Sequence, residues 1–228
     1  MNKYNKYIAE FLGTLLVVFI SAGAICAEHS VNLTGGQSIV PVWVITLFGI
    51  VIAAIVYATS YIAGSQINPA VTISHWATGR MYAGTALYYI LSQLAGAVLA
   101  AYFLRILFPT AILKVHLGTC LLGNGVELWK AALIECVVTF LFVFTIFSTT
   151  VDKRLSKILS GVAIGLVYMF GVSISSTFSG GALNPARVFG PAVVSGHFDN
   201  HYIWWLGPVS GALAAGFLYG KVFKKKSD

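Results

Sequence analysis

Charged residues are scarce in this sequence. Only 9% of the chain is Asp, Glu, Lys or Arg, whereas soluble domains average about 25%. Four long segments contain no charge at all: residues 29–79, 81–104, 158–186 and 200–220. Such a chain has too few charged residues to form a water-exposed surface, which excludes an ordinary soluble domain. A bilayer-spanning helix needs about 20 mainly apolar residues, and the sequence has room for roughly six.

The apolar segments predict an all-α membrane protein. We place the spans at residues 6–27, 40–62, 83–107, 128–150, 158–178 and 201–221. The first apolar run, Phe11 to Ala27, lacks a clear small-residue cleavage site before a polar mature region. It is therefore interpreted as the first membrane helix and not as a removable signal peptide.

Cysteine is also rare. The three cysteines form no CxxC motif, so neither a disulfide framework nor a metal site is predicted. His197, Asp199 and His201 lie close together in sequence, but a solvated loop explains them better than a metal site. No nucleophile–base pair stands out, so we expect neither an enzyme nor a cofactor.

The net charge of +7 does not indicate nucleic acid binding, because its distribution follows the predicted spans. Ten of the 14 basic residues fall on one side of an even-numbered bundle. They are Lys3, Lys6, Arg80, Lys153, Arg154, Lys157, Lys221, Lys224, Lys225 and Lys226. Excess Lys and Arg mark the cytoplasmic face, so both termini are predicted to be cytoplasmic.

The tripeptide Asn-Pro-Ala occurs twice, as Asn68-Pro69-Ala70 and as Asn184-Pro185-Ala186. The copies are 116 residues apart, so each lies in its own half of the 228-residue chain. Asn is a favoured helix N-cap and Pro a favoured first helical residue. Each copy therefore predicts a short half-helix, from residue 68 to about 77 and from 184 to about 195, too short to cross the bilayer.

The two halves match at other positions as well. Glu10 in the first span and Glu135 in the fourth are 125 residues apart, close to the spacing of the Asn-Pro-Ala copies. Two halves of three spans each have opposite orientations because three is odd. The chain is therefore predicted to be one channel domain, residues 1–228, made of inverted repeats of about 1–115 and 116–228. In such repeats, broken helices mark a site at the membrane midplane.

The segments before the half-helices are predicted to be extended, with carbonyl oxygens facing a lumen. The carbonyls in question are those of Ser65, Gln66, Ile67, Ala182 and Leu183. Asn68 and Asn184 would add amide donors at the centre. Two helix N-termini carry partial positive charge, which disfavours cations and protons. This arrangement suits a small, neutral solute that forms hydrogen bonds.

Three charged side chains lie at membrane depth. Glu10 and Glu135 are either parts of a proton relay or acceptors for backbone N–H groups of the adjacent loops. Their matching positions favour the second role, as loop-supporting carboxylates. Arg187 has no basic counterpart in the first copy, where Val71 stands instead. We interpret it as a lumen-facing donor that repels cations rather than as a structural arginine.

Together these residues resemble the aquaporin, or major intrinsic protein, family over nearly the whole chain. The signature is the pair of Asn-Pro-Ala boxes, Arg187 after the second only, Glu10 and Glu135, and Gly207-Pro208. The run from Phe189 to Gly196 and on to Pro208 is similar to vacuolar, tonoplast-type members of the water-channel branch. The resemblance implies six spans with two re-entrant half-helices and a homotetramer with one pore per subunit. It also implies an outer constriction formed by Phe48, Val172, Gly181 and Arg187.

The chain departs from the family pattern at two positions. Water-selective members usually carry His where Val172 stands, so the constriction should be wider and more apolar. Gln66 replaces a frequent His, which argues against pH gating at that position. On the other side, Val188 stands where glycerol-conducting members typically have Asp.

The resulting hypothesis is a passive water channel that also passes small neutral solutes and excludes ions and protons. The alternatives are a channel mainly for glycerol, urea, ammonia or hydrogen peroxide, a secondary transporter, and a structural junction protein. The expected location is the plasma membrane, although the vacuolar similarity leaves another membrane open. The expected partners are the lipid bilayer, water and small neutral solutes.

Overall fold

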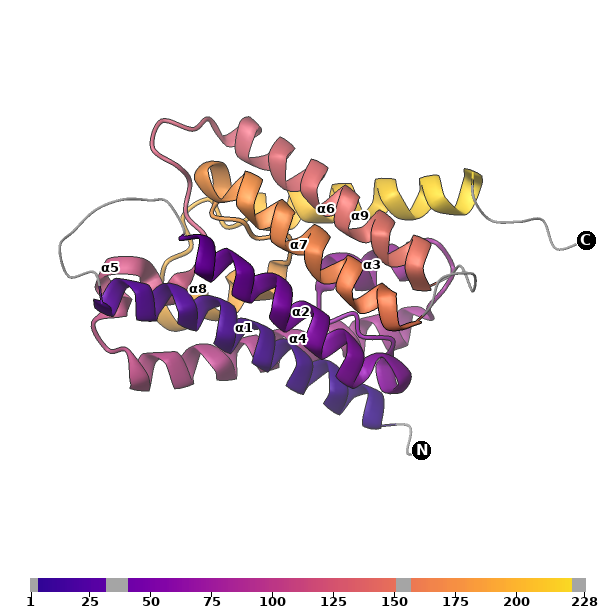
Figure 1. Cartoon of the computed structure of the whole chain (residues 1–228), viewed down its shortest axis with the longest axis horizontal. Helices are drawn as coiled ribbons and strands as arrows, with labels where there is room; N and C mark the ends of the chain where they lie inside the picture. Colours follow the sequence, from indigo (N-terminus) through magenta and orange to yellow (C-terminus); the bar gives the residue numbers. More distant parts are fainter. Residues whose placement is uncertain (1–3, 32–40, 151–156, 223–228) are drawn as a thin grey trace, which may run out of the picture.

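The structure is a computed structural model that describes residues 4–31, 41–150 and 157–222. In these ranges six long helices lie side by side along one axis (Figure 1). They are α1 (Asn5–Val31), α2 (Val42–Ala63), α4 (Ala83–Leu107), α6 (Leu128–Thr150), α7 (Lys157–Ser179) and α9 (Ile203–Val222). The six predicted spans match these helices to within four residues at every end, and the all-α membrane fold is confirmed.

Two short helices begin at the Asn-Pro-Ala motifs. Helix α3 spans Pro69–Ala77 and α8 spans Pro185–Ser195. A further short helix α5 (Ala111–Val115) and a 3₁₀ turn η1 (His116–Gly118) connect the two halves. The sequence had not indicated this connecting pair, because its residues carry no cap or periodic pattern.

Five of the six long helices in the described ranges are long and apolar enough to cross a membrane by length and composition. The exception is α9, with 20 residues. Its Trp, Gly, Pro, Ser and Tyr residues are only weakly apolar, and it ends near Lys221. Helix α9 nevertheless packs along α6, as α4 packs along α1.

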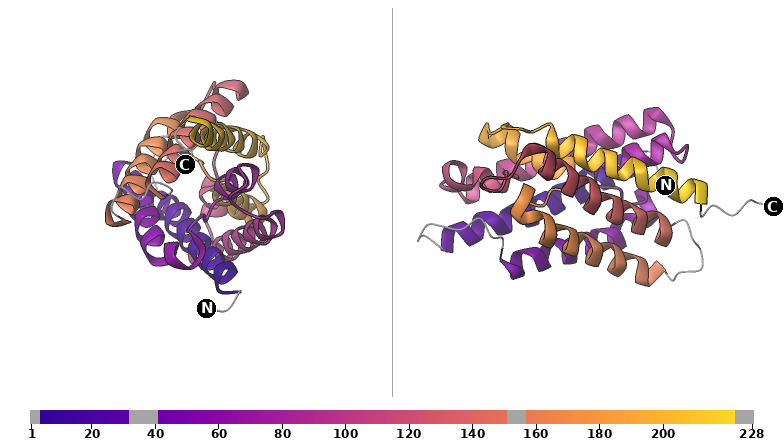
Figure 2. Two further views of the ribbon diagram at one scale, coloured as in Figure 1. Left: turned by 90° about the vertical axis from the view of Figure 1, so that its right-hand side faces the viewer. Right: turned by 90° about the horizontal axis from the view of Figure 1, so that it is seen from above.

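The packing repeats between the halves. Helices α1, α2, α3 and α4 of the first half correspond to α6, α7, α8 and α9 of the second. The halves also interlock, because α3 packs against α9 and α8 packs against α4. Figure 2 shows the two short helices on the side of the bundle that α4 and α9 form, when the bundle is viewed along its axis.

Two glycines allow the closest contacts between the long helices in the described ranges. A Cβ atom on Gly96 of α4 would lie 2.3 Å from the carbonyl oxygen of Phe11 in α1. A Cβ atom on Gly211 of α9 would lie 2.0 Å from the carbonyl oxygen of Cys136 in α6. Phe11 follows Glu10 and Cys136 follows Glu135, so the two contacts occupy matching positions in the two halves. They hold each carboxylate-bearing helix close to its neighbour.

The first residue of α1 and the last residue of α9 lie at the same end of the bundle (Figure 1). Arg80 is also at this end, since its Nη2 atom lies 3.8 Å from the position a Cβ atom would take on Gly220 of α9. Lys3, Lys153, Arg154, Lys224, Lys225 and Lys226 lie outside the described residues.

Candidate functional site

The two motif asparagines cap the two short helices. Asn68 Oδ1 accepts a hydrogen bond from the backbone N–H of Ala70 at 2.9 Å, and Asn184 Oδ1 accepts one from Ala186 at 3.0 Å. Both asparagines have extended backbone and are followed by Pro as the first helical residue. The motif therefore starts a helix where the preceding chain is irregular.

The asparagines also connect the two halves to each other. Asn68 Nδ2 donates to the carbonyl oxygen of Leu183 at 2.8 Å, and Asn184 Nδ2 donates to that of Ile67 at 2.9 Å. Each amide thus binds the residue just before the other asparagine. Both side chains are buried. This reciprocal pair brings the positive ends of α3 and α8 together inside the bundle.

A carboxylate supports the loop before each short helix. Glu10 accepts hydrogen bonds from the N–H groups of Gln66 (2.9 Å) and Ile67 (2.6 Å). Glu135 accepts from the N–H groups of Ala182 (2.9 Å) and Leu183 (2.8 Å). Both carboxylates are fully buried. A carboxylate that accepts two successive backbone N–H groups holds the loop in one conformation, because either bond would be costly to lose at this depth.

The side chains that complete these two networks differ. Gln93 Nε2 donates to Glu10 at 2.7 Å. Ser179 Oγ donates to Glu135 at 2.5 Å. The sequence did not point to either residue as part of the site. Polar residues at buried positions of apolar spans were the available signal.

The loops before the asparagines are not extended, contrary to our expectation. In the first loop, φ is +78° at Gly64, +50° at Ser65 and +42° at Ile67, and the second loop has +77°, +69° and +52° at Gly180, Gly181 and Leu183. Left-handed backbone between residues of ordinary φ turns successive N–H groups toward one point. That point is the Glu10 or Glu135 carboxylate, and the bonds to it hold the left-handed conformation.

The carbonyls expected to line a lumen fall into two groups. Those of Ile67 and Leu183 accept the asparagine amides, and that of Ala182 accepts the Tyr168 hydroxyl at 3.0 Å. In the described ranges, the backbone carbonyls of Ser65 and Gln66 accept no protein hydrogen bond. The side-chain oxygen of Gln66 is also buried without a partner. Carbonyls and side-chain oxygen together provide acceptors for a polar solute.

The four residues of the expected constriction come from four elements: α2, α7, the second loop and α8. The guanidinium carbon of Arg187 lies 5.5 Å from the centre of the Phe48 ring. A Cβ atom on Gly181 would lie 3.0 Å from Val172 Cγ1. Phe48, Val172 and Arg187 are all buried. The fold therefore places Arg187 against Phe48, and Gly181 against Val172.

Arg187 is buried with most of its donors unpaired. Its Nη1 atom donates to the sulfur of Cys120 at 3.0 Å, whereas Nε and Nη2 have no hydrogen-bond partner. A buried cation without partners is unfavourable in an apolar interior. These donors are therefore available to a polar solute. Cys120 was not among the expected site residues, since a cysteine in a connecting segment carries no sequence signal for this role.

The histidines do not form a second centre in the described ranges, where no group of three His, Cys, Asp or Glu side chains could hold a metal ion. His75 stacks on Phe147 with ring centres 4.7 Å apart. His116 stacks on His197 at 4.0 Å. His201 accepts a hydrogen bond from Trp205 at 3.3 Å.

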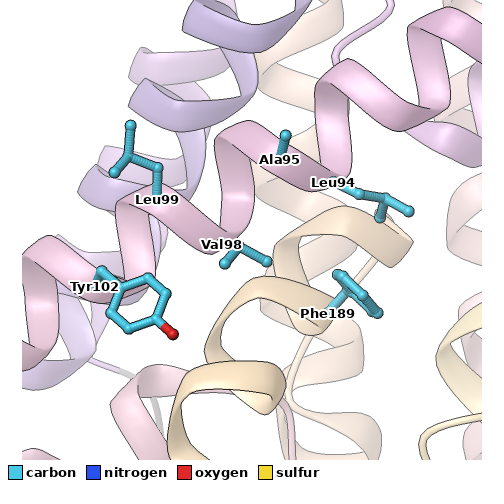
Figure 3. Close-up of a pocket in the computed structure, with 6 residues that line it drawn as sticks. All are labelled: Leu94, Ala95, Val98, Leu99, Tyr102 and Phe189. Carbon is cyan, nitrogen blue, oxygen red and sulfur yellow. The ribbon is translucent and has the colours of Figure 1, made fainter.

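A shallow groove on the outside of the bundle is separate from this polar site. It lies between α4 and α8 (Figure 3) and is lined by Leu94, Ala95, Val98, Leu99, Tyr102 and Phe189. Its walls are almost entirely apolar. Its lining offers a polar solute almost no hydrogen-bonding partner.

The geometry defines a class of protein: a membrane bundle in which two half-helices meet end to end at a polar centre. Comparison with solved structures gives the same fold. The aquaglyceroporin from Plasmodium falciparum superposes with a TM-score of 0.82 over 97% of each chain, at 20% identity.

Sequence comparison identifies the family. The family described as Major intrinsic protein matches residues 1–219. Aquaporin A of Dictyostelium discoideum is 35% identical over all of this chain and 82% of its own length. Aquaporin C of the same organism is 38% identical over 96% of this chain and 80% of its own length, and human Aquaporin-4 is 35% identical over 96% and 68%. The chain belongs to the major intrinsic protein family, the aquaporin channels, and is not an enzyme.

Proposed function

We propose that the chain is a passive channel for water that also passes small neutral solutes. The observation that carries this proposal is the set of unpaired polar atoms at the centre of an apolar bundle. The donors Nε and Nη2 of Arg187 and the acceptor Oε1 of Gln66 are buried without a protein partner. Buried polar atoms of this kind are normally satisfied by water. A file of water molecules along the two loops would satisfy them.

Exclusion of ions and protons follows from the same geometry. The N-termini of α3 and α8 meet at the asparagine pair, and each carries about half an elementary positive charge. The Arg187 guanidinium adds a full positive charge nearby. The positive ends of half-helices and an arginine are known barriers to cations and protons in such pores. A neutral solute meets no such barrier.

The breadth of solutes depends on Val172 and Gly181. Neither side chain donates a hydrogen bond, and Gly181 adopts φ of +69°, which favours glycine. The constriction therefore has one polar corner, Arg187, and a small apolar side. This supports passage of solutes somewhat larger than water. The second candidate is accordingly a channel mainly for glycerol, urea, ammonia or hydrogen peroxide.

The test is a stopped-flow solute panel on purified protein in liposomes. Vesicles with the protein are expected to shrink faster than empty vesicles in an osmotic step. Unchanged shrinkage with verified insertion would exclude a water channel. The Val172→His variant is expected to keep water permeability and to lose passage of glycerol and urea, because the larger side chain fills the space beside Gly181.

A secondary transporter is the alternative of another class. It would need a coupling carboxylate that faces the lumen, whereas Glu10 and Glu135 both bind backbone N–H groups. Flux that rises linearly with solute concentration would support the channel. Saturation at millimolar solute would support the transporter.

For the assembly and location, we propose a homotetramer in the plasma membrane with both termini cytoplasmic. The family resemblance supports the tetramer, and the distribution of basic residues supports the orientation. We further propose that residues 1–115 and 116–228 are inverted repeats, supported by the matching contacts of Gly96 and Gly211. The similarity to the tonoplast-type branch supports the alternative location, a vacuolar membrane. Finding the protein in that membrane would favour this branch over the plasma-membrane proposal.

A further inference from the structure

The guanidinium of Arg187 is held by a side chain from outside both pore loops. Cys120 lies just after η1, in the segment that connects the two halves of the chain. Its sulfur accepts a hydrogen bond from Arg187 Nη1 at 3.0 Å, and its own S–H donates to the carbonyl oxygen of Gly180 at 3.4 Å. Cys120 is 1% exposed and Arg187 is fully buried.

In the part of the chain that the structure describes, this sulfur is the one protein acceptor of the guanidinium. Arginine has five N–H donors, yet Nε and Nη2 have no partner. The ion pair found in the described ranges, between Glu127 and Lys130, lies elsewhere. The orientation of the guanidinium therefore depends on Cys120 and on the ring of Phe48, 5.5 Å from the guanidinium carbon.

The segment that carries Cys120 is itself fixed to the second loop and to α8. Thr119 Oγ1 donates to the carbonyl oxygen of Val188 at 3.1 Å, and the N–H of Gly123 donates to that of Phe178 at 3.0 Å. A Cβ atom on Gly180 would lie 3.0 Å from Cys120 Cα. These contacts fix the backbone of Cys120, and the fixed backbone places the sulfur beside Arg187.

We propose that Cys120 is a further specificity-determining residue of the constriction, a positioning residue that acts through Arg187. This inference rests on the proposed channel function. The Cys120 sulfur accepts from one N–H group only and leaves the others for the solute. Sulfur is also a weak acceptor, so it orients the guanidinium without neutralising its charge. Without it the guanidinium has no protein acceptor and is free to tilt across the Phe48 face. The opening beside Val172 and Gly181 would then change in size, and the electrostatic field of the guanidinium inside it would change as well.

The experiment measures the ratio of glycerol to water permeability in proteoliposomes. The variant Cys120→Ala removes the acceptor, and the loss of a weak charge-assisted hydrogen bond should change this ratio by about fivefold. The variant Cys120→Ser keeps a small acceptor and is expected to restore the wild-type ratio. The matched control is Cys136→Ala, the same change at a partly exposed cysteine of α6, which should leave the ratio unchanged.

A double-mutant cycle separates positioning from a general structural effect. In an Arg187→Val background, Cys120→Ala should not change the ratio further, because the side chain through which it acts is gone. An additive effect in that background would overturn the proposal. So would an unchanged ratio in Cys120→Ala alone.

Folding and basal conduction are controlled separately. Cys120→Val fills more of the vacated volume without an acceptor and should behave like Cys120→Ala. If neither apolar variant folds while Cys120→Ser does, the role is structural and the proposal is wrong. If vesicles with the wild-type protein shrink no faster than empty vesicles, the proposed channel function is wrong, and so is the role proposed for Cys120. If the wild type conducts and Cys120→Ala leaves the ratio of glycerol to water permeability unchanged, only this inference is overturned.

Discussion

In the proposed channel, Arg187 contributes both to the exclusion of cations and to the selection of solutes by size. Its guanidinium is buried beside Phe48, with Nε and Nη2 unpaired. The matching position of the first half is Val71, which is also buried. The two short helices thus start in the same way, with an asparagine cap and a proline, but differ in one charge at the matching third position after the asparagine. The proposed barrier to cations therefore comes in part from a residue that has no charged counterpart in the first short helix.

Arg187→Val should relax charge exclusion and leave the half-helices in place. The substitution introduces the residue that the first half carries at position 71 and removes the positive charge from the constriction. Cation or proton leak is expected to rise above wild type, with water permeability retained. The measurement is the collapse of a pH gradient, reported by a dye inside proteoliposomes. A leak no larger than wild type would contradict the role assigned to Arg187.

Glu10 is a structural residue in the geometry described above. Glu10→Ala would leave two backbone N–H groups without their acceptor and would remove one of the two acceptors of the Gln93 side chain. Each buried unsatisfied group costs about 1–3 kcal/mol. The thermal unfolding temperature of Glu10→Ala in detergent is expected to fall strongly. The unfolding temperature of Glu10→Gln should fall less, because one acceptor oxygen remains.

The matched control for this change is Glu127→Gln. Glu127 is exposed and forms its ion pair with Lys130 at 3.4 Å on the surface, where such pairs contribute about 0–1 kcal/mol. Its unfolding temperature should stay near wild type. Equal unfolding temperatures for Glu10→Ala and Glu127→Gln would show that Glu10 does not stabilise the loop.

At the level of helices and loops, the two short helices could be predicted from local sequence. Asn followed by Pro is a cap and first turn regardless of the rest of the fold, and the structure starts α3 and α8 at Pro69 and Pro185. The spans were equally accessible, because bilayer thickness fixes their length.

The conformation of the loops was not accessible from sequence. Ile67 adopts φ of +42°, which a β-branched residue disfavours on its own. It is held there by Glu10, 57 positions away. The contact between Cys120 and Arg187 likewise spans 67 positions. Such contacts exist only once the halves have packed, so no local pattern indicates them.

Helix α4 offers a paired test of close packing. Gly96→Ala would place a Cβ atom 2.3 Å from the Phe11 carbonyl oxygen, whereas Gly84→Ala in the same helix would meet no heavy atom within 4 Å. The first change forces α1 and α4 apart, and overpacking typically costs about 1–3 kcal/mol. The second replaces a poor helix former and should stabilise by up to about 1 kcal/mol.

The two variants should therefore shift the unfolding temperature in opposite directions. The measurement is thermal unfolding in one detergent, followed by circular dichroism. A Gly96→Ala protein as stable as Gly84→Ala would mean that α1 and α4 are not as closely packed as described.

For the whole molecule, we predict the orientation in the membrane from the distribution of positive charge. The start of α1, the end of α9 and Arg80 all lie at one end of the bundle. Lys6 and Lys221 lie near the same two helix ends. A positive-inside orientation places this end in the cytoplasm, and the segment between η1 and α6 on the other side.

Epitope tags test this orientation directly. A tag at the C-terminus should bind antibody only after the cells are permeabilised. A tag inserted at Gly125, where even a Cβ atom would meet no neighbour within 4 Å, should bind antibody on intact cells. Each tagged protein serves as the control for the other, provided both still conduct. Staining of the C-terminal tag on intact cells would reverse the orientation, and Arg187 would then lie toward the cytoplasm instead of the outside.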